Sequence, residues 1–147
     1  MSFELPEELQ LLRDTLRRYV DAEMIPVELQ TCEGVKLKPE YKKKFEEDAK
    51  KLGLWLMDVP EEFGGQGMGV LATVVVTEQM ARTTALPTRG GYFTGPSVRA
   101  ILYELADDLK DKYLYPVIRG EKRACFGQTE PDAGSDPGSM RTTAVRD

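Results

Sequence analysis

The sequence predicts an all-α domain over residues 1–121, followed by the opening of a β domain over residues 122–147. Apolar residues recur at intervals of three and four along most of the chain up to Gly120, which is the spacing of one face of a helix. After Gly120, short apolar segments alternate with Pro, Gly, Ser and Asp, as in strands and turns. The 147 residues are 41% hydrophobic and 31% charged, which suits one folded domain.

The first helix is expected to have Ser2 as its N-cap and Pro6 in its first turn. Pro26 lacks the N–H that a helix interior needs, so the helix should break near Met24 and continue only briefly, to about Thr31. The apolar residues that share one face of this helix are Leu5, Leu9, Leu12, Leu16, Tyr19 and Val20.

The second helix should begin at Pro39, after a loop over 32–38, and end at Gly53. Acidic residues at 46–48 separate its lysines, so its charged side is interpreted as a solvated helix face. Its apolar stripe is Tyr41, Phe45, Ala49 and Leu52.

Residues 60–69 are dense in glycine, and Gly65, Gly67 and Gly69 suggest a phosphate-binding loop. Val70 stands where the GxGxxG fingerprint requires glycine, however, so a tight connector is the favoured interpretation. A third helix should follow over about 70–82, with a stripe of Leu71, Val74, Val75 and Glu78.

Residues 83–95 are predicted to be a loop, because they are rich in Thr, Gly and Pro. A fourth helix is predicted around Val98–Leu105 and a fifth from Leu109 to Gly120, and all five stripes should face one core. Strands are expected at 123–128 and from 142 onward. Because two strands with nothing to complete them are marginal in water, the chain is expected to be a fragment.

Composition excludes several classes of site. The chain has no histidine, which rules out Ser-His-Asp and Cys-His catalysis and every histidine-containing metal site, and no metal is expected. Cys32 and Cys125 match no metal-ligand spacing and are expected to be small core hydrophobes. A net charge of −5 argues against a nucleic-acid-binding face. The absence of a long apolar run and of a basic leader predicts no membrane span and a cytoplasmic location.

Residues 126–136 carry the strongest chemical signal. The Thr129 hydroxyl can both donate and accept a hydrogen bond at the polar edge of a flat heterocycle. Gly134 permits a positive φ and a close backbone approach, and amides at 134–136 could hold a pyrophosphate. Glu130, Asp132 and Asp136 would repel a phosphate, so they should point away or accept from loop N–H groups.

Thr129–Asp136 reads TEPDAGSD and closely resembles the TEPxAGSD flavin-binding signature of the acyl-CoA dehydrogenase family. Further resemblances agree in order and spacing over nearly the whole chain: Leu52–Leu54 with Pro60–Gly67, Glu78–Arg82, and Lys112–Pro116 with Gly120–Glu121. The resemblance implies that residues 1–121 are the family's N-terminal helical domain. It also implies that residues 122–147 are the first strands of a truncated β-barrel domain.

The resemblance implies FAD as cofactor and assigns it five residues. Phe126 and Gln128 would contact the flavin through main-chain atoms, and Thr129 would bond its pyrimidine edge. Gly134 and Ser135 would face the pyrophosphate, and Ser135 would also contact the pantetheine of an acyl-CoA substrate. Gln128 departs from the small apolar residue usual there. The loop from Gly90 to Ser97 corresponds loosely to the floor of the acyl pocket.

The implied reaction is the α,β-dehydrogenation of an acyl-CoA thioester to a trans-2-enoyl-CoA. No catalytic residue is expected in this chain, because the family's glutamate base lies in a C-terminal domain, and Glu61, Glu62, Glu78 and Glu130 are not candidates. An electron-transfer flavoprotein or a similar acceptor, and a dimer or tetramer, are the implied partners. The alternatives are an acyl-CoA oxidase, a flavin monooxygenase on the same scaffold, or a non-catalytic helical interaction module.

Overall fold

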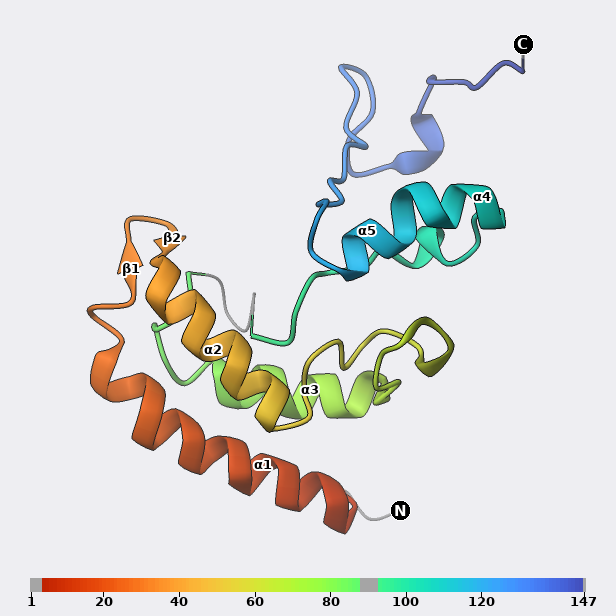
Figure 1. The fold of residues 1–147 in the computed structure, drawn as a ribbon. Helices are drawn as coiled ribbons and strands as arrows, with labels where there is room; N and C mark the ends of the chain where they lie inside the picture. The colour runs from red at the N-terminus through yellow and green to blue at the C-terminus, as the bar shows by residue number, and fades with distance from the viewer. Residues whose placement is uncertain (1–3, 88–92, 147) are drawn as a thin grey trace.

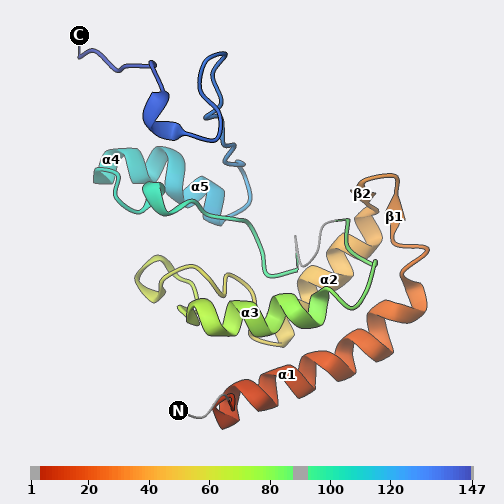
Figure 2. The ribbon, with the colours of Figure 1, turned by 180° about the vertical axis from the view of Figure 1, so that it is seen from behind.

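A computed structural model describes residues 4–87 and 93–146 as a mainly helical chain (Figure 1). Two groups of elements follow each other along the chain. The first group holds helices α1, α2 and α3 and a short hairpin, and the second holds α4 and α5, beyond which the C-terminal residues extend (Figures 1 and 2). The elements are α1 (Glu7–Tyr19), β1 (Cys32–Glu33), β2 (Lys36–Leu37), α2 (Pro39–Lys51), α3 (Gly69–Met80), α4 (Asp107–Leu109) and α5 (Tyr115–Ile118).

Helix α1 forms where the spacing predicts it. Pro6 precedes its first residue in an extended conformation, and acidic side chains in the first turn and arginines in the last turn both complement the helix dipole. The expected cap, Ser2, lies outside the described residues. The predicted break near Met24 is confirmed, because α1 gives way to a π-helical turn at Val20–Met24 and then to a 3₁₀ turn at Ile25–Val27.

Residues 32–38 form a two-stranded antiparallel hairpin rather than the expected loop. Cys32 pairs with Leu37 and Glu33 with Lys36, and Gly34 takes the first turn position at φ 58°. A two-residue turn of this kind needs a positive φ there, which glycine adopts without strain.

Helix α2 matches its predicted bounds and stripe, with Phe45 and Ala49 buried and Gly53 at φ 70° ending it. A polar contact ties it to α1: the Tyr19 hydroxyl donates to Asp48 at 2.9 Å, and Lys44 donates to Asp48 at 2.7 Å. Partial burial opposes the charge on Asp48, but these hydrogen bonds outweigh it and lower the pKa of that carboxyl.

Helix α3 turns a different face inward from the one predicted. Leu71 and Val74 are 50% and 55% exposed. Its sequence is apolar on most sides, so periodicity could not select the inner face. The residues of α3 that are buried are Ala72, Val75, Val76, Gln79 and Met80.

The fourth predicted helix is only a 3₁₀ turn, Ala100–Leu102, in which Ile101 is 70% exposed. The fifth is helical throughout, because α4 continues through a π-helical turn, Lys110–Leu114, into α5. Pro116 cannot donate to the carbonyl of Lys112, and the Lys122 ammonium donates to that carbonyl instead, at 2.8 Å.

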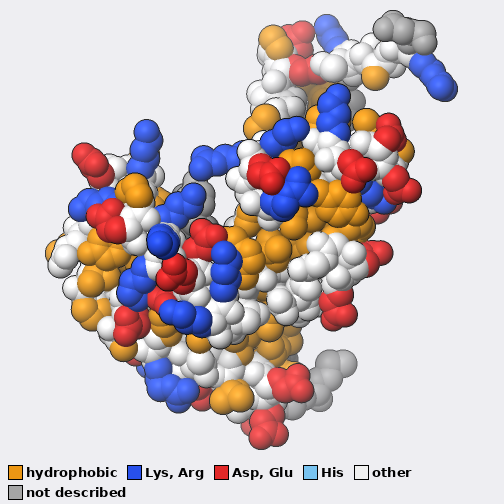
Figure 3. All heavy atoms as spheres, in the orientation of Figure 1, with side chains coloured by type: hydrophobic (Ala, Val, Ile, Leu, Met, Phe, Trp, Pro, Cys, Tyr) orange, Lys and Arg blue, Asp and Glu red, His pale blue; other side chains and the backbone are white. Residues whose placement is uncertain are grey.

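The five stripes were expected to face one core. They form two hydrophobic clusters instead. The first cluster joins α1, α2 and α3 around Leu16, Phe45 and Met80. The second gathers Val59, Leu114 and Ile118 beneath α4 and α5, where hydrophobic side chains also reach the surface (Figure 3). The segment between α2 and α3 contributes side chains to both clusters.

The strands expected at 123–128 and from 142 onward are not formed among the described residues. Only an isolated antiparallel bridge joins Glu130 and Ala133 in this region. A strand requires a neighbouring strand to satisfy its backbone, and no described segment supplies one here.

Gly65 tests how tightly the segment between α2 and α3 is folded. A Cβ at Gly65 would overlap the backbone oxygen and the side chain of Val59, so Gly65→Ala should lower the free energy of unfolding by about 1–3 kcal/mol. At Gly127, a Cβ would meet no atom within 4 Å, so Gly127→Ala is the matched control. Urea denaturation of both variants is the measurement, and equal midpoints would contradict the packing described for Gly65.

Candidate functional site

The segment carrying the predicted flavin-binding residues is a turn closed by its own backbone. The N–H of Glu130 donates to the carbonyl of Ala133 at 2.8 Å, and the N–H of Ala133 donates back at 3.3 Å. Ala133 is the one buried residue of Thr129–Asp136. The turn is therefore anchored at Ala133 and leaves its other residues at the surface.

The carboxylates of this segment accept from loop N–H groups, as predicted. Glu130 accepts from the N–H groups of Arg141 and Thr142 at 2.8 and 2.9 Å. Asp136 accepts from the N–H of Gly138 at 3.0 Å and from the Ser139 hydroxyl.

These hydrogen bonds also set the titration of the two acids. Bonds from Thr142 and Arg141 lower the pKa of Glu130, and bonds from Ser139 and Gly138 lower the pKa of Asp136. Both carboxylates are thus held ionised by the loop itself.

The five predicted cofactor-binding residues share one property. None of them makes a hydrogen bond within the described part of the chain, through side chain or backbone, although each backbone has donor and acceptor groups to offer. The Phe126 ring, 72% exposed, lies near the Arg99 guanidinium, which is 5.6 Å from the ring centre. The five residues are Phe126, Gln128, Thr129, Gly134 and Ser135.

Gly134 differs from the expectation in one respect. Its φ lies outside the positive range that glycine alone favours. A Cβ at Gly134 would meet no atom within 4 Å, so the space in front of this backbone is open. The glycine therefore supplies room for a close approach, not a left-handed turn.

The glycine segment 60–69 is a connector, as predicted. Its N–H groups are directed at its own chain: those of Gln66, Gly67 and Met68 donate to the carbonyls of Leu56, Val59 and Met57 at 3.0–3.1 Å. Amides used in this way cannot cradle a phosphate.

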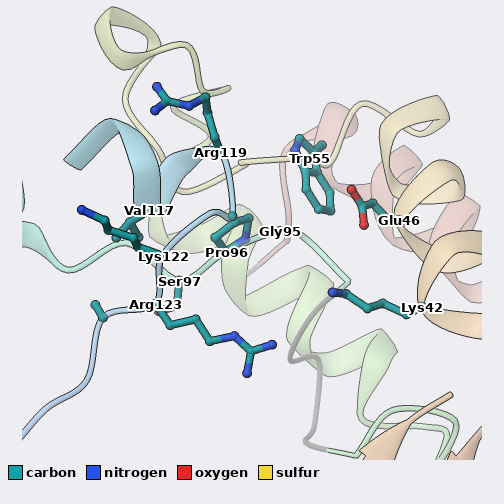
Figure 4. Close-up of a pocket in the computed structure, with 12 residues that line it drawn as sticks. Lys42, Glu46, Trp55, Gly95, Pro96, Ser97, Val117, Arg119, Lys122 and Arg123 are labelled. Carbon is teal, nitrogen blue, oxygen red and sulfur yellow. The ribbon is translucent and has the colours of Figure 1, made fainter. Parts of the chain in front are cut away.

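A cleft of about 530 Å³ lies between α2 and the end of α5, and the sequence did not predict it. Three separate stretches line it, so no local motif marks it (Figure 4). Of the expected acyl-pocket loop, Gly95–Ser97 line this cleft, whereas residues 90–92 lie outside the described residues. The lining residues are Lys42, Glu46, Trp55, Gly95, Pro96, Ser97, Val117, Arg119, Gly120, Lys122, Arg123 and Ala124.

The cysteines are not the core residues that were expected. Cys125 is exposed, and Cys32 is half-buried beside the carbonyl of Ala85. Across 4–87 and 93–146 no cluster of His, Cys, Asp or Glu has the geometry to hold a metal. No helix in the same ranges is long and apolar enough to cross a membrane.

Comparison with known proteins adds a family to this geometry. Residues 6–121 match the family model described as Acyl-CoA dehydrogenase, N-terminal domain. The short-chain specific acyl-CoA dehydrogenase, mitochondrial, of Sus scrofa is 34% identical over 151 residues, which cover 99% of this chain and 35% of that protein.

Solved structures agree with this match. A glutaryl-CoA dehydrogenase from Mycobacterium smegmatis in complex with FADH2 aligns with a TM-score of 0.62 and 25% identity, over 97% of this chain and 36% of the other. A chain described as an electron transferring flavoprotein of Acidaminococcus fermentans aligns with a TM-score of 0.64 and 27% identity, over 100% of this chain and 38% of the other.

The chain therefore belongs to the acyl-CoA dehydrogenase family, as the resemblance of its TEPDAGSD segment and of its further motifs implies. It spans little more than a third of the length of the curated relatives it matches, 34–39% for three of them.

Glu130 provides a test of the loop geometry. Because its folded pKa is lowered, its contribution to loop stability is present above the ordinary value of 4.5 and is lost as the pH falls through the lowered value. The amide proton shifts of Arg141 and Thr142 should therefore titrate with an apparent pKa below 4.5 in NMR spectra. Glu130→Gln should abolish that titration and Glu104→Gln should preserve it. Persistence of the titration in Glu130→Gln would show that another acid faces these amides.

Proposed function

We propose that this chain is the helical N-terminal part of an FAD-dependent acyl-CoA dehydrogenase, together with the opening of its β domain from residue 122. The reaction of the whole protein is the α,β-dehydrogenation of an acyl-CoA thioester to a trans-2-enoyl-CoA. The observation that carries the proposal is the loop at 126–136, in which Glu130 and Asp136 accept from nearby backbone amides, while the five predicted cofactor residues make no hydrogen bond among the described residues.

FAD suits this donor set. The loop offers main-chain groups at Phe126 and Gln128 and a hydroxyl at Thr129, all exposed or half-buried and free to bond a flavin edge. The amides of Gly134 and Ser135 are free for pyrophosphate oxygens, and the open space at Gly134 lets them come close. Ser135 is proposed to contact the pantetheine of the substrate as well. When bound, FAD supplies the hydride acceptor for the reaction.

The general base is proposed to come from outside these 147 residues. The acids in the described chain have other positions: Glu61 and Glu62 form a 3₁₀ turn, Glu78 lies exposed on α3, and Glu130 holds the loop. This chain's own contribution is therefore binding and orientation.

The partners follow from the same proposal. The reduced flavin requires an acceptor, proposed to be an electron-transfer flavoprotein or a protein like it, and the whole protein is proposed to be a dimer or tetramer. The similarity to the chain described as an electron transferring flavoprotein supports this choice of acceptor. The cytoplasmic location stays a prediction, since the Sus scrofa relative is named as mitochondrial.

The competing functions make different predictions. An acyl-CoA oxidase or a flavin monooxygenase would show rapid reaction of the reduced flavin with oxygen, whereas a dehydrogenase would not. A non-catalytic helical interaction module would bind no FAD, even as the whole protein.

Two substitutions test the flavin loop in the whole protein that the gene encodes. Thr129→Val removes a hydrogen bond worth about 0.5–1.5 kcal/mol and should weaken FAD binding by roughly twofold to tenfold. Ser135→Pro removes an N–H and should distort the turn, with a larger loss. Thr77→Val, which changes an exposed hydroxyl on α3, is the control. FAD content after gel filtration is the measurement, and wild-type retention in both loop variants would refute the assignment.

The 147-residue chain alone is expected to bind FAD more weakly than micromolar and to oxidise no acyl-CoA. Its candidate loop covers only one side of a cofactor that must be largely enclosed to bind well. Flavin fluorescence titration and an acyl-CoA-dependent dye-bleaching assay are the measurements. Micromolar binding or turnover above buffer would show that this chain holds the complete site.

A further inference from the structure

The cleft between α2 and the end of α5 carries a positive charge that the chain does not neutralise. We propose that it binds a small organic anion, a carboxylate or phosphate held between Lys42 and Arg123, with an apolar body on Trp55, Pro96 and Val117. None of the five predicted flavin-binding residues lines the cleft, so this site is separate from the predicted flavin site, although Gly95–Ser97 of the expected acyl-pocket loop belong to its lining.

The other charged residues of the cleft are already paired. Arg119 makes two hydrogen bonds to Glu121, at 2.7 and 3.0 Å. Lys122 donates to the carbonyl of Lys112 at 2.8 Å. Among the described lining residues the one acid is Glu46, which forms an ion pair with Lys50 at 3.0 Å.

Lys42 and Arg123 are the two cations that remain. The side chain of neither forms an ion pair or a hydrogen bond within 4–87 and 93–146, and the sequence at 88–92 contains no Asp or Glu. Figure 4 shows their side chains pointing toward each other from opposite walls, while those of Arg119 and Lys122 point away. Two like charges that face each other repel, and an anion between them turns this repulsion into two attractions.

The rest of the lining selects for an anion with an apolar part. Trp55, Pro96 and Val117 supply the apolar surface, and the Ser97 hydroxyl makes no hydrogen bond among the described residues. Gly95 packs its backbone against Trp55, because a Cβ there would lie 3.4 Å from the indole. The cleft volume, about 530 Å³, lies within the usual range for small-molecule sites, roughly 300–1,000 Å³.

Trp55 makes the proposal directly measurable, because it is the only tryptophan in the chain. The experiment titrates the protein with cyclohexanecarboxylate, with the neutral cyclohexanecarboxamide and with inorganic phosphate, at low salt. Trp fluorescence and calorimetry follow binding. The variants are Lys42→Met and Arg123→Met, and the matched control is Lys43→Met, an exposed neighbour on α2 that does not line the cleft.

A saturable fluorescence change with an anion, absent with the amide, is the expected result. Each cleft variant should weaken binding by about tenfold or more, because hydrogen bonds to charged groups are worth roughly 1.5–3 kcal/mol, and Lys43→Met should leave it unchanged. Tighter binding of the carboxylate or of phosphate supports the site and identifies the anion. The proposal is overturned by the absence of a saturable change, by equal binding of the amide, or by an equal loss in Lys43→Met, which would indicate only the general field of α2.

Discussion

The backbone turn at Leu56 connects the two hydrophobic clusters of the molecule. Leu56 has a left-handed conformation, φ 58°, which for a branched side chain costs about 1–3 kcal/mol. Three hydrogen bonds hold it there: its N–H donates to Thr94 at 2.8 Å, and its carbonyl accepts from Val59 and Gln66 at 3.0 and 3.1 Å. The turn directs side chains of one short segment to different clusters, Leu54 and Met57 to the first and Leu56 and Val59 to the second. The position of α5 relative to α2, and hence the cleft, depends on this turn.

Hydrogen bonds beside the first cluster attach the chain that follows α3, residues 83–85, to the turn that precedes the hairpin. The Thr31 hydroxyl, fully buried, donates to the carbonyl of Ala85 at 2.7 Å. Glu28 accepts from the Thr83 hydroxyl at 2.9 Å and from the N–H of Thr84 at 3.0 Å. Buried hydroxyls and amides need such partners, so the turn before the hairpin and the turn after α3 fix each other. The position of the chain directly after α3 is therefore fixed by residues more than fifty positions earlier in the sequence.

Sequence reasoning succeeded where local chemistry decides the structure. Pro39 and Gly53 bound α2, Pro26 ends the regular helix, and the acids of the predicted flavin-binding loop accept from nearby N–H groups, as carboxylates in loops commonly do. It failed where the outcome depends on distant neighbours. The inner face of α3 is chosen by α1 and α2, since nearly every side of α3 is apolar, and 123–128 has no strand to pair with. The cleft was invisible for the same reason, because three stretches form it.

The predicted flavin-binding loop and the cleft show two ways in which a chain leaves polar groups without partners. In the loop, free groups are backbone amides whose competing carboxylates have been withdrawn, so their next partner must bring acceptor atoms. In the cleft, they are the side-chain cations of Lys42 and Arg123, beside an Arg119 and a Glu46 held in ion pairs and a Lys122 hydrogen-bonded to a carbonyl. Arg123 lies three residues before Phe126, a span of at most about 11 Å when extended, so both features begin on one continuous segment.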